Sequence, residues 1–69
     1  MNEIFCKRLF QLRKEKGLKQ SELALKLNTS TRRISHLETG NAEPDLDTLL
    51  KISEIFNVTT DYLLGKTDY

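Results

Sequence analysis

The side chains best suited to recognise another molecule are Thr31, Arg32, Arg33 and His36, which lie close together in the chain and are called here the recognition residues. An arginine guanidinium can donate two hydrogen bonds to the paired acceptors of guanine, and a threonine methyl group can contact the methyl group of thymine. Histidine adds a polar ring that suits a base contact or an ordinary surface equally well. These residue types indicate recognition of base edges, provided that the fold presents them together.

Patterns for catalysis or metal binding do not occur in the sequence. One histidine and one cysteine, Cys6, can build neither a structural zinc site nor an internal disulfide. There is no nucleophile elbow or phosphate-binding loop, and Gly17, Gly40 and Gly65 lie far apart. We therefore expect no enzyme activity, cofactor, metal or small-molecule ligand, and we expect Cys6 to be a small, partly buried apolar residue.

Charge is divided unevenly along a chain whose total is only +1. Residues 1–36 carry nine Lys or Arg against three Glu, which gives +6, and residues 37–69 carry two Lys against seven Asp or Glu, which gives −5. A basic face opposite an acidic one would orient the domain on a polyanion such as DNA. A solvated charge pattern without a partner has the same composition, so charge alone leaves both interpretations open.

Apolar residues recur at helical spacing, and no stretch alternates in the way that predicts a strand. The pattern predicts an all-α fold, a compact bundle of five helices at 4–16, 20–27, 30–39, 44–56 and 60–64. A glycine or asparagine follows each helix, where a positive φ lets the chain turn. Pro44 indicates the start of the fourth helix, with Asp45 and Asp47 near its positive end. The expected core consists of Phe5, Leu9, Leu12, Leu23, Ala24, Leu27, Ile34, Leu37, Leu46, Leu49, Ile52, Ser53, Phe56, Val58, Tyr62 and Leu63.

The second and third expected helices are short and are joined by a tight corner at Asn28-Thr29. Helices of this length are marginal alone and must be held by their neighbours, which leaves one side of the third helix free to project outward. With Ile34 and Leu37 turned to the core, the recognition residues fall on that outer side or its borders. Three of the four lie in the first turn, the part of a recognition helix that meets base edges in the major groove.

Four segments stand in the order and at the spacing of a known family: LFQLRKEKGLKQSELALKLN, ISHLETG, PDLDTLLKISEIFNV and TTDYLLG. Through them the chain resembles the phage-repressor and Cro type of helix-turn-helix regulator, also called the Xre family. The resemblance implies one lambda-repressor-like domain over residues 1–69, with a family core at about 9–65 and the helix-turn-helix at the second and third helices. It also implies sequence-specific binding of double-stranded operator DNA by a transcriptional regulator, a repressor, with the third helix in the major groove.

The resemblance further implies roles for single residues. The recognition residues would read bases or adjoining phosphates, with Arg32 and Arg33 foremost, and His36 is equally compatible with a plain surface position. Arg13 and Glu38 match an internal ion pair that ties the first helix to the end of the third. Breaking such a pair from one side costs about 3–5 kcal/mol where burial is deep. Gln20 would support the recognition helix as well as contact a phosphate. The residues implied to contact DNA phosphates are Lys19, Gln20, Ser30 and Asn41.

Two of the departures from the family's pattern affect the expected phosphate contacts. Lys19 stands where relatives commonly have a Ser or Thr cap, so the second helix loses a side-chain acceptor, although the lysine can itself approach phosphate. Glu43 lies in the loop after the third helix, where many relatives have basic residues, and its charge would oppose phosphate. We therefore expect the phosphate contacts to come mainly from the first half of the chain.

The main alternative is a protein-interaction module on the same fold, of antitoxin-like or anti-repressor-binding type. Leu25 would be exposed in a monomer, as Leu50 and Ile55 would be in part, and such residues are either ordinary surface positions or a partner surface. The basic residues gather on the first three helices, which favours DNA. We also expect a homodimer on the operator, formed through the C-terminal helices. No apolar run suits a membrane span or signal peptide, so we expect a cytoplasmic, nucleoid-associated protein of bacterial or phage origin.

Overall fold

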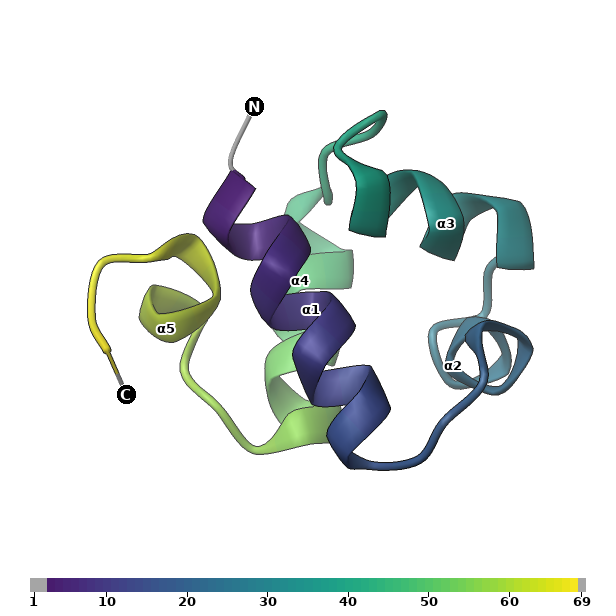
Figure 1. Cartoon of the computed structure of the whole chain (residues 1–69), viewed down its shortest axis with the longest axis horizontal. Coiled ribbons are helices and arrows are strands. Elements are labelled where there is room, and N and C mark those ends of the chain that lie inside the picture. Colours follow the sequence, from purple (N-terminus) through teal and green to yellow (C-terminus); the bar gives the residue numbers. More distant parts are fainter. Residues whose placement is uncertain (1–2, 69) are drawn as a thin grey trace.

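Short amphipathic stretches divided by glycine and asparagine give five helices in the computed structural model, which describes residues 3–68 (Figure 1). The helices are α1 (Glu3–Glu15), α2 (Gln20–Lys26), α3 (Thr31–Thr39), α4 (Leu46–Phe56) and α5 (Thr60–Leu64). The prediction of an all-α fold with five helices is confirmed. Each expected helix is present, and the largest difference is at α4, which begins at Leu46 rather than at Pro44.

Residues at the helix borders explain where the helices begin and end. Within residues 3–68, positive φ occurs at the five positions predicted from the sequence, Gly17, Asn28, Gly40, Asn57 and Gly65. At Gly65 space also requires glycine, because a Cβ there would come within 2.9 Å of Ile4 Cδ1. The start of α4 was predicted too early because Asp45 is its N-cap, accepting a hydrogen bond from the Thr48 N–H at 2.8 Å, and Pro44 precedes that cap.

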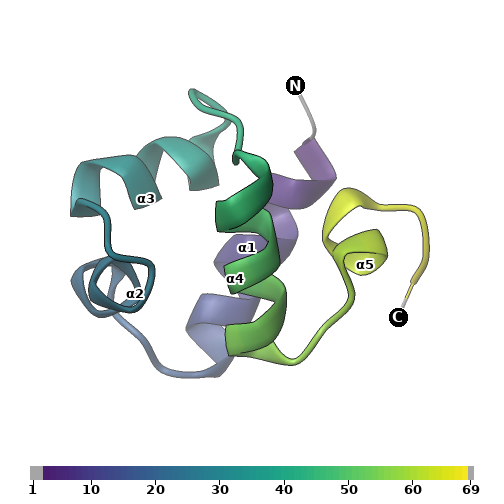
Figure 2. The ribbon, with the colours of Figure 1, turned by 180° about the vertical axis from the view of Figure 1, so that it is seen from behind.

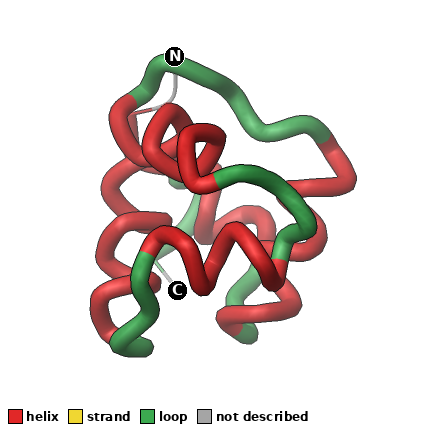
Figure 3. Tube along the Cα trace, turned by 90° about the vertical axis from the view of Figure 1, so that its right-hand side faces the viewer, coloured by secondary structure: helices red, strands yellow, loops and turns green. Residues whose placement is uncertain are grey.

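The helices enclose one apolar core. In Figure 1, α1 crosses the middle of the molecule, with α2 and α3 on one side of it and α5 on the other, and the reverse view shows α4 in front (Figure 2). A side view shows only helices and loops, with no strand among residues 3–68 (Figure 3). Full burial of a large apolar side chain contributes about 1.5–3 kcal/mol. The core is formed by Phe5, Leu9, Leu23, Ala24, Leu27, Ile34, Leu37, Leu49, Ile52, Phe56 and Leu63.

One expected core residue is at the surface. Leu46 was predicted to face inward, but it is 73% exposed. The buried stripe of α4 runs through Leu49, Ile52 and Phe56, whereas Leu46 is four residues before Leu50 and shares its more exposed face. Four further expected core residues, Leu12, Ser53, Val58 and Tyr62, are only partly buried. Cys6 is more buried than expected, at 8% exposure, and no helix of residues 3–68 is long and apolar enough to cross a bilayer.

Candidate nucleic-acid interface

The first turn of α3 presents its polar side chains to solvent. Ile34 and Leu37 are fully buried, and at 100° per residue Arg32 lies on the opposite side of the helix. Thr31 and Arg32 are exposed, and the half-buried His36 follows Arg32 by four residues, which places it about 40° away on the same outer face. Arg33 is half-buried at the border of this face, 100° from Arg32. Among residues 3–68, no group forms a hydrogen bond or ion pair with the side chain of Arg32. The outer face of α3 therefore offers donors that the fold itself does not use.

Two of the residues expected to contact phosphate lie at helix starts. The Ser30 hydroxyl accepts a hydrogen bond from the Arg33 N–H at 3.1 Å, so Ser30 is the N-cap of α3 and keeps its own hydroxyl hydrogen for another acceptor. Lys19 is exposed before α2 and supplies no side-chain acceptor, as the sequence predicts. The Glu22 carboxylate compensates in part, because it accepts a hydrogen bond from the Lys19 N–H at 2.7 Å.

Behind this face, Arg13, Gln20 and Glu38 form a buried group called here the inner polar cluster. Arg13 Nε lies 2.6 Å from Glu38 Oε2 and Nη2 lies 3.1 Å from Oε1, so the pair is bidentate. The two side chains are only 8% and 3% exposed. Arg13 Nη1 also donates to the Leu18 carbonyl at 2.9 Å, and Gln20 Nε2 donates to Glu38 Oε1 at 3.0 Å. The cluster thus joins α1, the start of α2 and the end of α3.

The cluster includes Gln20, which the family resemblance implied to support the recognition helix. Its side-chain amide is bonded inward to the end of α3, so it supports the recognition helix directly. An amide nitrogen carries two hydrogens, and one remains for an outside acceptor. The Arg13–Glu38 pair that the family resemblance implied is present, and every buried side-chain N or O atom among the described residues has a hydrogen-bond partner.

The loop from Asn41 to Asp45 lies beside the outer face of α3. The backbone N–H groups of Asn41 and Ala42 both donate to the His36 carbonyl, at 2.9 and 3.2 Å, and the Asn41 side chain is exposed. Arg33 Nη2 donates to the Glu43 carbonyl at 3.2 Å. Hydrogen bonds from Thr48, with attraction from the Arg33 guanidinium, lower the pKa of Asp45. The loop is therefore bonded to α3 at two places, the His36 carbonyl and the Arg33 guanidinium.

Two of the basic residues in α1 are used by the fold. Arg8 Nη1 donates to the carbonyls of Tyr62 and Thr67, the latter at 2.7 Å, and the guanidinium lies 4.1 Å from the centre of the Tyr62 ring. Arg8 also pairs with Asp68 at 3.8 Å, and Arg13 belongs to the inner polar cluster. The surplus of basic charge available to a partner is therefore smaller than the sequence suggests. The exposed basic residues of the first half of the chain are Lys7, Lys14, Lys16, Lys19, Lys26 and Arg32.

Ser35 also lies on the outer side of α3, although it is not one of the recognition residues predicted from the sequence. It follows Arg32 by three residues, a spacing that places both on one side of a helix, and it is half-buried. That spacing was the available signal. Thr39 shares the same side, but its hydroxyl donates to the Ser35 carbonyl at 2.9 Å.

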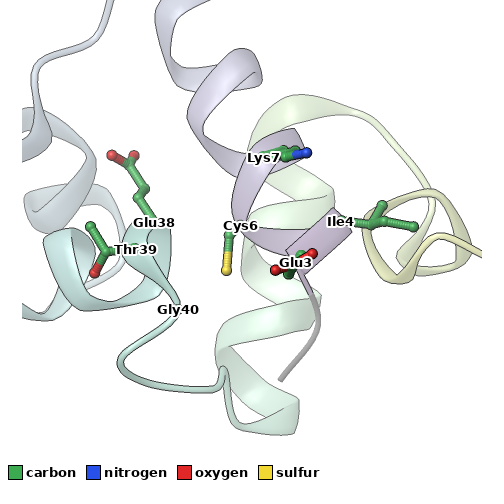
Figure 4. Close-up of a pocket in the computed structure, with 7 residues that line it drawn as sticks. All are labelled: Glu3, Ile4, Cys6, Lys7, Glu38, Thr39 and Gly40. Atoms are coloured by element: carbon green, nitrogen blue, oxygen red, sulfur yellow. The ribbon is translucent and has the colours of Figure 1, made fainter.

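A pocket lies between the first turns of α1 and the end of α3 (Figure 4). The Cys6 sulfur points into it, whereas Ile4 points toward α5 and the Glu38 carboxylate is committed to Arg13. No three His, Cys, Asp or Glu residues within 3–68 are grouped so that they could hold a metal ion. Polar groups do not converge on the pocket as they do in a ligand site. The outer face of α3 is therefore the better candidate interface.

Comparison with known proteins gives concordant results. Residues 9–63 match the helix-turn-helix family. The chain is 48% identical over 62 residues to the HTH-type transcriptional regulator ImmR of Bacillus subtilis (strain 168). The aligned region is 90% of this chain and 49% of ImmR. It is 43% identical over 61 residues to the HTH-type transcriptional activator BcrR of Enterococcus faecalis. The aligned region is 88% of this chain and 30% of BcrR. The chain thus spans about half the length of ImmR and less than a third of the length of BcrR.

Two solved structures have the same fold. A transcriptional regulator from Listeria innocua superposes with a TM-score of 0.85 at 34% identity, covering 88% of this chain and 57% of that one. The P22 c2 repressor in complex with synthetic operator 9T also gives a TM-score of 0.85, at 28% identity, covering 91% of this chain and 96% of the repressor chain. The expected repressor-like arrangement of helices is therefore confirmed.

Proposed function

The chain belongs to the helix-turn-helix family, of the Xre type that its sequence resembles, and from this premise we propose that it binds double-stranded DNA sequence-specifically as a transcriptional regulator. The observation that carries the proposal is the outer face of α3. Its first turn exposes Thr31 and Arg32 without internal partners, while the opposite side of the helix is fixed in the core. Such a helix can enter the major groove with its first turn at the base edges.

The proposed contacts divide into bases and phosphates. Thr31, Arg32 and His36 face the base edges, with Arg33 at the inner border of this group. Arg32 is the strongest candidate because its guanidinium is exposed and can donate two hydrogen bonds to guanine. The hydrogen that Gln20 retains and the hydroxyl hydrogen of Ser30 suit phosphate oxygens. The proposed phosphate contacts are Lys19, Gln20, Ser30 and Asn41.

We further propose that the protein is a repressor. The likeness to the P22 c2 repressor, found over 96% of the chain in its solved structure, favours repression. BcrR, an activator, is covered over only 30% of its length.

The DNA-bound form that we propose is a homodimer. Helix-turn-helix dimers bind two half-sites about one helical turn apart, roughly 34 Å. The C-terminal helices carry partly exposed apolar residues, Leu50 at 48% and Leu64 at 37%, which suit a contact between two copies. We place the protein in the cytoplasm on nucleoid DNA, where an operator would be found.

Selection of duplexes from a random pool tests the proposal. We expect one motif to be enriched as two half-sites about 10 base pairs apart. In fluorescence anisotropy, log K for that motif should fall with log salt with a slope of about −2 or steeper, because at least two phosphates are neutralised. No enriched motif together with a flat salt response would contradict DNA binding and would favour a protein-interaction module on the same fold.

A further inference from the structure

The two neighbouring arginines of α3 differ in their surroundings. Arg32 is exposed, and no group among residues 3–68 bonds to its side chain. Arg33 is half-buried, and its Nη2 donates to the Glu43 carbonyl at 3.2 Å. Sequence alone treats the pair as equivalent, but one guanidinium is available to a partner and the other is partly engaged within the protein.

The bond from Arg33 reaches the loop that begins α4. Glu43 lies between Asn41, an exposed loop residue, and Asp45, the N-cap of α4. The loop is also bonded to α3 at its first residues, because the Asn41 and Ala42 N–H groups donate to the His36 carbonyl. The Arg33 guanidinium also attracts the Asp45 carboxylate. Arg33 therefore supplies a second attachment of this short loop to α3, at the first turn of the helix.

We propose that Arg33 is a positioning residue, which holds the 41–45 loop at the height where it meets the DNA backbone, and that Arg32 alone of the two arginines reads a base. The inference rests on the proposed function and divides labour within the same interface. A reader supplies discrimination at one base pair, whereas a residue that sets the position of a backbone-contacting loop changes affinity for all sequences alike.

The division has a geometric basis. A bidentate contact to guanine needs the edge of the guanidinium to face the groove. In Arg33 the Nη2 group is directed to the Glu43 carbonyl, so that edge is turned toward the loop. Arg32 lies one residue earlier, 100° around the helix and opposite the buried Ile34 and Leu37. Arg32 has no contact within the fold that limits how its donors are turned, whereas the bond to Glu43 restrains the direction of the Arg33 guanidinium.

The test compares Arg32→Ala and Arg33→Ala on the selected operator and on a set of its single-base variants. Arg32→Ala should lose about 5- to 150-fold in affinity for the operator and should no longer discriminate at one position of each half-site. Arg33→Ala should weaken binding to every duplex by a similar factor, about 3- to 30-fold, and leave the ranking of the variants unchanged. Lys66→Ala, which removes one exposed positive charge from the far end of the chain, is the matched control and should change affinity by about twofold or less.

A second measurement separates positioning from a plain loss of charge. If Arg33 acts through the loop, Asn41→Ala should cost less affinity in the Arg33→Ala background than in the parent chain. Urea unfolding of each variant verifies that the fold persists, and Arg33→Gln replaces Arg33→Ala should the latter fail to fold. Loss of discrimination at a base pair in the Arg33 variant, or additive effects of the two substitutions, would overturn the inference. A parent chain that enriches no duplex would instead refute the proposed function.

Discussion

The two ends of α3 carry polar side chains in opposite situations. At the C-terminal end Glu38 is buried, and Arg13 and Gln20 bond to both of its carboxylate oxygens. At the N-terminal end Arg32 is exposed, and no side chain or carbonyl of residues 3–68 bonds to it. Because the Glu38 carboxylate is paired internally, it supports the fold. The Arg32 guanidinium has no such pairing and is available to a partner.

The difference shows why one short helix can be both fixed and exposed. A buried carboxylate is tolerated only when its hydrogen-bonding capacity is filled, so the inner polar cluster fixes the position of α3 in relation to α1 and α2. A solvated guanidinium needs no internal partner. Its bonds to water are exchanged for bonds to a base only when DNA is present. Each end can therefore be disturbed without the other, and the two should respond to different measurements.

The largest effect on stability is expected at the inner polar cluster. Glu38→Ala would leave the Arg13 guanidinium buried without its counter-ion and should lower the free energy of unfolding by about 3–5 kcal/mol. Urea denaturation measures the change. Glu54→Ala, at an exposed site of α4, is the control and should stay within about 0.5 kcal/mol of the parent. A change at Glu38 as small as that of the control would contradict a structural role for the cluster.

A smaller loss of stability is expected on substitution of Arg8. Comparing it with Lys7 distinguishes a basic residue of α1 that the fold uses from one that is available to a partner. Arg8→Ala removes hydrogen bonds to two carbonyls and the contact with the Tyr62 ring, and should cost about 1–2 kcal/mol of unfolding free energy. Its neighbour Lys7 is exposed, so Lys7→Ala should leave stability nearly unchanged. Equal stability of the two variants in thermal unfolding would mean that Arg8 does not anchor α5.

The acid response of the helix cap at Asp45 is expected to be weaker still. The pKa of Asp45 is lowered in the folded state, so its ionised form stabilises the fold. This contribution is complete above the pKa of the unfolded chain, about 3.9, and is lost as pH falls through the lower folded value. Asp45→Asn keeps an acceptor for Thr48 but does not titrate. The Asp45→Asn variant should therefore lose less unfolding free energy between about pH 5 and pH 2 than the parent does. If the unfolding free energies of the two proteins fell in parallel with pH, the stabilising role of ionised Asp45 would be refuted.

The smallest effect is expected at Leu46, the residue whose burial was predicted incorrectly. Because its side chain is 73% exposed, Leu46→Ala should change the unfolding free energy by less than about 0.5 kcal/mol. Leu49→Ala, three residues later in the buried stripe, should cost about 2–4 kcal/mol. Similar losses for the two variants would place Leu46 in the core after all.

Local signals in the sequence were sufficient for the fold but not for side-chain partners. Helical spacing and the glycine and asparagine stops are properties of neighbouring residues, and they located all five helices. The burial of Leu46 was misjudged because periodicity does not show which side of the first turn of α4 is covered. The inward bond of Gln20 and the use of Arg8 by the C-terminal residues depend on contacts between distant segments. The charge count from the sequence therefore included Arg8 among the charges available to DNA, although Arg8 is bonded within the fold.

The most direct test of the division within α3 is to measure the stability and the DNA affinity of Arg32→Ala together. We predict that its unfolding free energy stays within about 0.5 kcal/mol of the parent, because Arg32 supports nothing within the fold. Its affinity for the selected operator should fall by about 1–3 kcal/mol, the value of one good base contact. Unchanged operator affinity, or an affinity loss matched by an equal loss of stability, would contradict the assignment of the outer face of α3 to DNA recognition.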